Sequence, residues 1–397
     1  MNNVTPIVPR FLSTALACLF CTALVCTMPT LSLGQSEEFQ PNPAAGAGSI
    51  IVQSKFGGQI FGFDIDQNGT EGVLSEAQTL SNGNVLAAVE TFDQTTGKIL
   101  AVLTSTKTQD DFVTRGVVGN SVGLVEHEHV VSLFNVQRTF GIINPLSGNK
   151  FTAQWTPPIG AKHLINQVSR TQGSPNAAVF AQDNSGNFIP YVFSSNVAAN
   201  TFGPVVKVTD SFNFGSVPPP MAYNFVTNLA ILGGGNGCFR CVPEIGVADL
   251  VNGTFSEFAG QGLGFVNGIA VDSTKNIACT TTEDDASVEF YDLTTNRAIT
   301  VVLPNSERLQ IFSGADVEFD DVHKLFFVAQ PVSSSTPTGS TIYVYNSSGV
   351  LQETLNGFSF SNVSNVIPMH IALNPSTRSG FVDGPSAGVS NIQSFTY

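Results

Sequence analysis

The sequence predicts an all-β protein, a β-propeller of four-stranded blades whose ring is closed by strands from both ends of the chain. Three observations predict this fold. Short apolar runs broken by polar turns come in groups of four, the groups repeat at roughly 40–55 residues, and no helical periodicity follows residue 35. A four-stranded sheet buries both faces only by stacking on its neighbours, which explains the repeat. We expect seven blades, with six or eight as alternatives.

Residues 267–303 are the template of one blade: a strand with a polar head, a turn, a second strand, a loop, a third strand ending in "YDLTT" and a fourth strand. Residues 315–331 repeat the first two strands, and residues 341–355 repeat the last two. Residues 369–384 repeat the opening, and residues 391–397 add a third strand. A strand from the N-terminal part of the chain is therefore expected to complete the last blade and leave no open edge.

The repeat continues upstream with more variation. Residues 87–105 are interpreted as an opening pair of strands, and segments within 129–156 as strands two to four of the next unit. A large sandwich or a β-helix is the competing fold, but a sandwich seldom repeats one motif so often and the rungs of a β-helix are shorter. The centres of the predicted third strands are Ile142, Pro190, Gly246, Phe290 and Val344.

Residues 1–34 have the layout of a secretory signal peptide: a basic residue, a continuous apolar run and small residues before Gln35. The alternative is an uncleaved membrane anchor. We assign 35–48 to a short flexible segment and 49–397 to a single propeller domain. The predicted location is extracellular, or periplasmic in a bacterium, with no membrane contact after removal of the signal.

Charge limits the expected partners. The whole chain has a formal net charge of −14, and residues 35–397 keep 15 basic against 30 acidic residues. An acidic surface repels phosphate backbones and anionic membranes, so we expect no nucleic acid partner. A small molecule, an extracellular protein or a glycan remains as the expected ligand.

Cysteines and glycosylation motifs fit an exported chain. Cys238 and Cys241 lie in a glycine-rich turn and are predicted to form a local disulfide. Cys279 lies in an apolar strand, where a buried, inert thiol is expected. In a host that glycosylates, four sequons mark surface turns, at Asn68, Asn252, Asn346 and Asn362.

The first strands of a propeller line its central channel, where loops from many blades converge on a ligand. Alignment on the template places Gln167 level with Asn267, and places Asp316 and His370 level with Gly268. Gln167, Asn267, Asp316 and His370 are therefore the candidate ligand-binding residues.

Two further clusters could hold a metal ion. His127 and His129 alternate on one face of a predicted strand, so two imidazoles could chelate one metal, with His163 or His370 as a third ligand; the alternative is a solvated strand end. Acidic residues in 64–72 begin like a calcium loop but lack its final glutamate, which favours a plain hairpin turn.

The segment "NGIAVDSTKN" (267–276) resembles a blade opening in the gluconolactonase and senescence-marker-protein family of six-bladed propellers. The resemblance implies a divalent cation, usually calcium, that is held by Asn267 and polarises a lactone carbonyl. The family's other two ligand positions fall near Ala88 and on Ala315, with Asp316 adjacent. A wider resemblance to secreted NHL and YVTN repeat propellers covers most of the chain.

Two functions follow from the sequence. The first is a secreted binding or scaffold module that uses its central funnel and loops. The alternative is a calcium-dependent lactonase or ester hydrolase with Asn267, Asp316 and His370 near the metal. Whether the protein is an enzyme stays open at this point.

Overall fold

The structure is a computed structural model whose described part lies within one compact unit, Pro41–Tyr397. It describes residues 45–397 except for a set of segments. These segments are 68, 106–109, 120–121, 133–134, 148, 156–163, 171–175, 183–188, 197–198, 200, 210, 214–218, 236–241, 283–286, 303–315, 331–340, 359–369 and 387–388.

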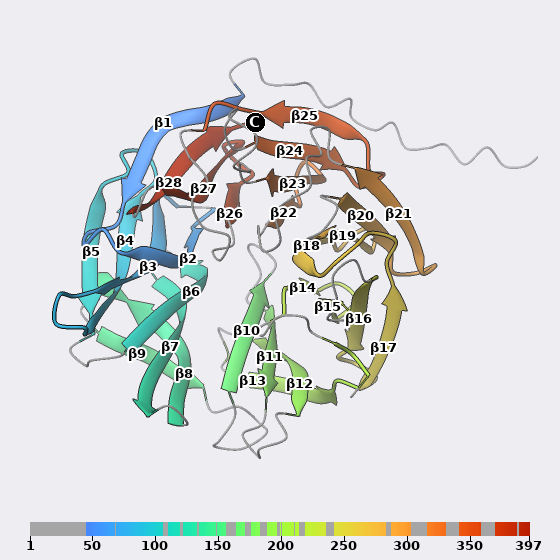
Figure 1. Cartoon of the computed structure of the whole chain (residues 1–397), viewed down its shortest axis with the longest axis horizontal. Helices are drawn as coiled ribbons and strands as arrows, with labels where there is room; N and C mark the ends of the chain where they lie inside the picture. Colours follow the sequence, from blue (N-terminus) through green and yellow to red (C-terminus); the bar gives the residue numbers. More distant parts are fainter. Residues whose placement is uncertain are drawn as a thin grey trace, which may run out of the picture. The chain divides into compact units, whose positions relative to one another are not determined.

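The described residues form seven antiparallel four-stranded sheets, the blades of a β-propeller (Figure 1). Blade 1 contains β2 (Gln59–Ile65), β3 (Glu71–Thr79), β4 (Val85–Asp93) and β5 (Ile99–Thr104). Blade 2 contains β6 (Asp110–Gly119), β7 (Val122–Ser132), β8 (Asn135–Asn144) and β9 (Asn149–Trp155), with a 3₁₀ turn at Pro145–Ser147. Blade 3 contains β10 (Leu164–Arg170), β11 (Asn176–Gln182), β12 (Pro190–Asn196) and β13 (Thr201–Lys207).

The next three blades have the same order of strands. Blade 4 contains β14 (Met221–Asn224), β15 (Leu229–Gly235), β16 (Pro243–Asp249) and β17 (Thr254–Ala259). Blade 5 contains β18 (Val266–Asp272), β19 (Ile277–Thr282), β20 (Ser287–Asp292) and β21 (Arg297–Val302). Blade 6 contains β22 (Val317–Asp320), β23 (Leu325–Gln330), β24 (Thr341–Asn346) and β25 (Leu351–Leu355).

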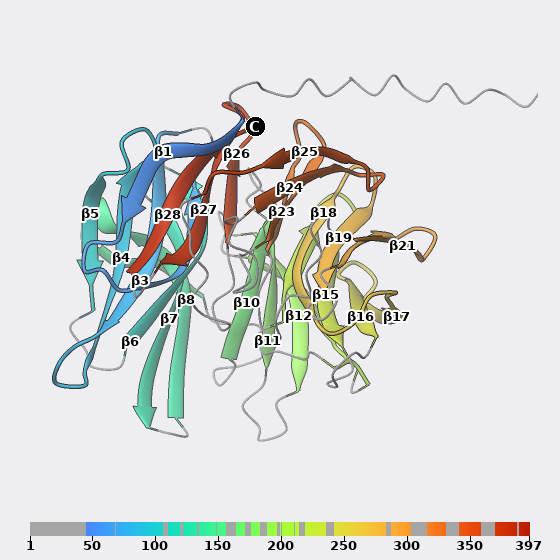
Figure 2. The same cartoon turned by 45° about the horizontal axis from the view of Figure 1, so that its top comes forward.

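Blade 7 closes the ring with strands from both ends of the described chain. It contains β26 (Ile371–Asn374), β27 (Ser379–Ser386), β28 (Val389–Thr396) and, as its outer strand, β1 (Gly46–Gln53). The inner strands β2, β6, β10, β14, β18, β22 and β26 each contact the next, and β26 contacts β2 (Figure 1). Figure 2 shows β1 beside β28 at the closure of the ring. This confirms the predicted closure by an N-terminal strand, and β1 begins within the segment assigned to 35–48.

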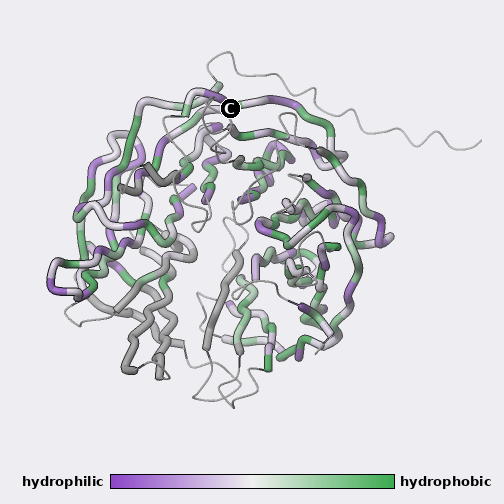
Figure 3. Tube along the Cα trace, in the orientation of Figure 1, coloured by the Kyte–Doolittle hydropathy of each residue, from purple (hydrophilic) through white to green (hydrophobic). Residues whose placement is uncertain are grey.

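Apolar cores lie between neighbouring blades. One core joins blades 5 and 6 through Cys279, Phe290, Phe326 and Tyr345, and Cys279 is buried as expected. Strands such as β15, β19 and β24 bury several consecutive residues, so both faces of these sheets are covered, as radial stacking requires. Figure 3 shows hydrophobic segments along the strands of the ring. Among the described residues, no helix has the length and apolar character needed to cross a membrane.

Asp and Asn side chains that accept backbone amides stabilise many of the hairpin turns. In blades 4, 5 and 6 the first strand ends in Asn224, Asp272 or Asp320, whose Oδ1 accepts the amides of the residues two and three positions on, at 2.8–3.1 Å. Such side chains favour turns because they replace the missing backbone acceptor. The last turn residue is left-handed, as at Asn276 (φ 58°), a conformation that Asn tolerates.

The same turn geometry shows that the sequence assignment of residues 87–105 is wrong. Residues 87–105 are not an opening pair: they contain β4 and β5, the third and fourth strands of blade 1. Their turn at Asp93 has the same geometry as the turn at Asp292 between the third and fourth strands of blade 5. The segments "ETFD" (90–93) and "EFYD" (289–292) are therefore structural equivalents, and the five predicted third-strand centres all lie on third strands.

Candidate functional site

The predicted polar ring lies at the start of the inner strands. Asp316 and His370 directly precede β22 and β26, and their carbonyl oxygens accept the amides of Ala329 and Asp383 at 3.0 and 3.1 Å. Counted back from the first hairpin, both residues are level with Gly268, as the alignment predicted. The structure therefore places these two candidates side by side on adjacent blades.

The alignment of Gln167 with Asn267 is wrong by one residue. Both inner strands carry a β-bulge, which lies between Ile165 and Gln167 in β10 and between Val266 and Gly268 in β18. The bulged residue in β10 is the one before Gln167, so Gln167 is level with Gly268 instead. Both bulges lie at the same place in their strands, so the bulge itself causes no offset, and the residue level with Asn267 is Asn166.

Asp316 and His370 form a connected polar group. The two carboxylate oxygens of Asp316 accept the amides of Val317 and Ile371 at 2.9 and 3.0 Å, so Asp316 joins blade 6 to blade 7. His370 Nδ1 lies 2.8 Å from Asp383 Oδ2, and the His370 amide donates to Asp383 Oδ1 at 2.6 Å. The imidazole is 28% exposed, so one side of this group faces solvent.

Burial raises the pKa of Asp316 to about 6, although His370 and the two backbone amides favour its charged form. Two acidic residues lie two positions further along the inner strands. Glu318 in β22 and Asp64 in β2 are equivalent in register, and burial together with Asp316 and Asp64 holds the pKa of Glu318 well above its usual value. The equivalent residues of blades 4, 5 and 7 are alanines, at Ala222, Ala270 and Ala372.

Two buried glutamates were not singled out from the sequence. Glu90 in β4 and Glu289 in β20 occupy the same position of their blades, three residues before the turn aspartate, and both are fully buried. Each accepts amides of the segment that leads into its own blade. Glu90 accepts the amide of Lys55 at 2.9 and 3.1 Å, and Glu289 accepts the amides of Gln261 and Gly262. The shared E-x-x-D spacing is the signal that could have found them.

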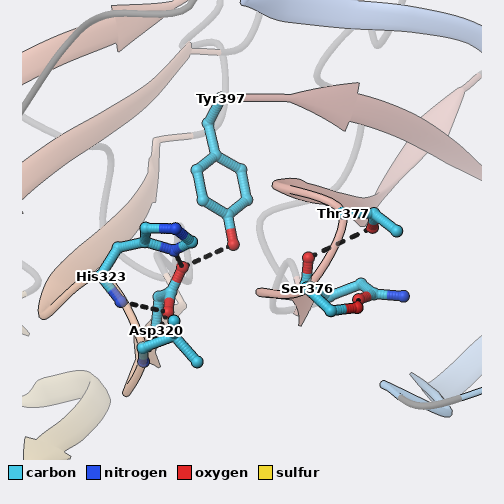
Figure 4. A network of polar contacts seen from close by, with 7 residues as sticks. Asp320, His323, Ser376, Thr377 and Tyr397 are labelled. Atoms are coloured by element: carbon cyan, nitrogen blue, oxygen red, sulfur yellow. Dashed lines mark hydrogen bonds and ion pairs between the residues drawn. The ribbon is translucent and has the colours of Figure 1, made fainter.

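Asp320 forms a second His–Asp pair (Figure 4). Its buried carboxylate lies 2.7 Å from His323 Nδ1 and accepts the Tyr397 hydroxyl at 2.7 Å. Because Tyr397 follows β28 of blade 7, the contact links two blades. Similar links join Ser347 to Asp272 at 2.7 Å between blades 6 and 5. The Asp320–His323 pair is therefore part of the packing between blades.

The other predicted sites are placed only in part. His127 and His129 lie on β7, a second strand rather than a channel strand, opposite Phe112 and Asp110, and their side chains are outside the described ones. Cys238, Cys241, His163, Asn68, Asn362 and residues 1–34 also lie outside the described residues. Asn252 and Asn346 lie at hairpin turns, and Asn252 is exposed.

Of the calcium site that the family resemblance implies, the described residues include Asn267 and Asp316. Within the described ranges, no three His, Cys, Asp or Glu side chains are placed to hold one metal ion. Both carboxylate oxygens of Asp316 already accept backbone amides. Asn267 lies in the bulge of β18, one level before Asp316. Calcium binding by this chain stays a prediction.

Comparison with solved structures shows the fold. The chain resembles Raptor from Chaetomium thermophilum with a TM-score of 0.55 and 10% sequence identity, covering 89% of this chain and 29% of that one. It resembles U3-55K with a TM-score of 0.54 and 10% identity, covering 88% of this chain and 99% of that one. This chain thus spans under a third of the length of Raptor.

No protein-family model and no curated protein matches the sequence. At 10% identity the two structural likenesses show a β-propeller and nothing finer. The resemblances to gluconolactonases and to NHL or YVTN repeats therefore stay predictions. The chain is a β-propeller by both its own topology and its structural neighbours.

Proposed function

We propose that this chain is a secreted binding module that receives its ligand at the mouth of the central channel, where blades 6, 7 and 1 meet. The observation that carries this proposal is the polar group on their inner strands. Asp316 and His370 directly precede the inner strands of blades 6 and 7. Glu318 lies two residues after Asp316, and its electrostatic neighbours include Asp64 of blade 1. A site built from loops and strand ends of several blades is the usual way in which a propeller binds.

The charge of this group indicates the class of ligand. Asp64 and Asp316 both raise the pKa of Glu318, which means that each of the two carboxyl groups repels the Glu318 carboxylate. A cationic group would relieve that repulsion and favour the charged carboxylates. The net charge of −14 adds long-range attraction for such a ligand. A basic small molecule or a basic segment of an extracellular protein fits the channel mouth best.

Calorimetric titration with a short arginine-rich peptide and a matched glutamate-rich peptide tests the proposal. We expect the basic peptide alone to bind, and to bind at least about tenfold more weakly to the Glu318→Gln variant. The Glu257→Gln variant removes an exposed acid on the outer strand β17 and serves as the matched control. Because burial raises the pKa of Asp316 to about 6, binding should strengthen from pH 5 to pH 7.

Two outcomes would contradict the proposal. The first is equal weakening in Glu318→Gln and Glu257→Gln, which would mean non-specific attraction to an acidic surface. The second is binding of neither peptide at pH 7 and low salt, which would leave the channel mouth without a cationic ligand.

A further inference from the structure

The strand that closes the ring is an outer strand whose pairing is interrupted. Val52 is the fully buried side chain of β1 and packs with the partly buried Ile50 in the core between blades 7 and 1, whereas Ile51 is 44% exposed. The pairing of β1 with β28 has an irregularity between Ala47 and Ile51. An outer strand opens locally at lower cost than the inner strands of a blade, so what lies at its ends contributes to its attachment.

The C-terminal end of β1 runs straight into a loop that two buried carboxyl groups hold. The amide of Lys55 donates to both oxygens of Glu90, at 3.1 and 2.9 Å. The amides of Phe56 and Gly58 donate to the two oxygens of Glu76, at 2.9 and 2.7 Å. A Cβ on Gly58 would lie 2.5 Å from the Ala77 carbonyl oxygen and 2.8 Å from Glu76 Oε2, so the loop is fitted closely to this carboxyl.

The two carboxyl groups also contact each other. Glu76 in β3 and Glu90 in β4 are both fully buried, and their side chains share a hydrogen bond. Two carboxyl groups can share a hydrogen bond only if one of them carries a proton. Burial, the hydrogen bond to Glu76 and its negative charge raise the pKa of Glu90 to about 8, against the opposing effect of Lys55.

The charged groups around this pair come from few elements. Glu76 from β3 and Lys55 from the loop are the ones that act on Glu90. The strands β5 and β28 carry no ionisable side chain. On the side of blade 2, Thr114 of β6 donates its amide to Ser75 Oγ at 2.8 Å. The ionisable residues of β6 are Asp110, Asp111 and Arg115, whose side chains lie outside the described ones.

We propose that the Glu76–Glu90 pair is a pH-sensitive latch that fixes the loop after β1 and thereby keeps the ring closed. While Glu90 keeps its proton, the two carboxyl groups together carry at most one negative charge. They can then stay buried and accept the three loop amides. When Glu90 loses its proton, two carboxylates face each other without solvent. The loop then releases and β1 separates from β28. This proposal concerns the closure of the ring and is independent of the ligand at the channel mouth.

Hydrogen exchange of the purified chain tests the latch. The readout is the protection factor, corrected for the intrinsic rate at each pH, of the amides in 51–58. Opening releases the proton of Glu90, so protection should fall by up to about tenfold per pH unit between pH 5 and pH 8 and level off above pH 8. Amides of β19 in blade 5 serve as the internal control and should keep their protection.

The Glu90→Gln variant should remove the pH dependence, because the amide group hydrogen-bonds to Glu76 at every pH. The Glu289→Gln variant changes the equivalent residue of blade 5 and should leave the profile of 51–58 unchanged. A flat profile in the wild type overturns the proposal whatever the variants do. A slope in Glu90→Gln equal to that of the wild type, or an equal slope in β19, overturns it as well.

Discussion

Blades 1 and 5 bury a glutamate at the same position for the same structural purpose, yet give it different neighbours. Glu90 and Glu289 each hold the segment that enters their blade. Glu289 also accepts the Tyr291 hydroxyl, whereas Glu90 lies against Glu76. By register, blade 5 has Thr282 where blade 1 has Glu76. The position in the repeat sets the structural role, and in blade 1 the neighbouring Glu76 adds to the effect of burial in raising the pKa of Glu90.

The largest effect should come from removing the glutamate of blade 5. In Glu289→Ala, the amides of Gln261 and Gly262 and the hydroxyl of Tyr291 lose their buried acceptor. Each unsatisfied buried donor costs about 1–3 kcal/mol, so we expect unfolding to become easier by about 3 kcal/mol or more. Urea unfolding measures this, and a loss under about 1 kcal/mol would show that the linker does not depend on the carboxylate.

Replacing the glutamate of blade 1 should change the pH dependence. The raised pKa of Glu90 means that the folded state binds a proton that the unfolded state has released, so stability falls as pH rises from about 4.5 to 8. Between pH 6 and 7.5 this contributes about 2 kcal/mol. Thermal unfolding of Glu90→Gln should lack this decline, and a parallel decline in wild type and variant would contradict the comparison.

Turn aspartates should give the opposite pH dependence and a smaller effect. Hydrogen bonds from Thr295 and Thr294 lower the pKa of Asp292, so its contribution is present above about pH 4 and is lost as pH falls. Asp292 is only partly buried, which limits the effect of Asp292→Ala to about 1 kcal/mol or less. Urea midpoints at pH 3 and pH 7 check this; a larger loss at pH 3 than at pH 7 would exclude it.

A similarly small effect is expected at Asn267. If its role is to support the bulge of β18, Asn267→Ala should cost about 1 kcal/mol and calcium should leave the melting temperature unchanged in wild type and variant. Differential scanning fluorimetry with and without calcium measures both. A calcium-induced rise in the wild type that disappears in the variant would instead support the metal-dependent lactonase.

The sequence carried the repeat because the turns are local. An Asp or Asn followed four residues later by Asn, Lys or Gly marks the hairpins, and these residue types have a direct conformational reason to be there. The closure of the ring was predictable because residues 369–397 supply only three strands, so the last blade needs a fourth from the N-terminal part of the chain. The level of Asp316 and His370 was predictable for the same reason, since their distance from the first hairpin is fixed.

What the sequence missed depends on contacts between strands. The alignment paired Gln167 with Asn267, whereas the strand pairing makes Asn166 the equivalent residue. The third and fourth strands within 87–105 were taken for an opening pair because both hairpins have similar apolar runs. Glu76 and Glu90 lie 14 residues apart in sequence and meet only through the pairing of β3 with β4.

The comparison of the two blades depends on one protonation state, which infrared difference spectroscopy measures directly. The C=O stretching band of a protonated carboxyl group, recorded as wild type minus Glu90→Gln, should be present at pH 6.5 and titrate away near pH 8. A difference band that has already disappeared by pH 5 would show that Glu90 is charged like an ordinary glutamate. That result would contradict the account of blade 1 and, with it, the latch.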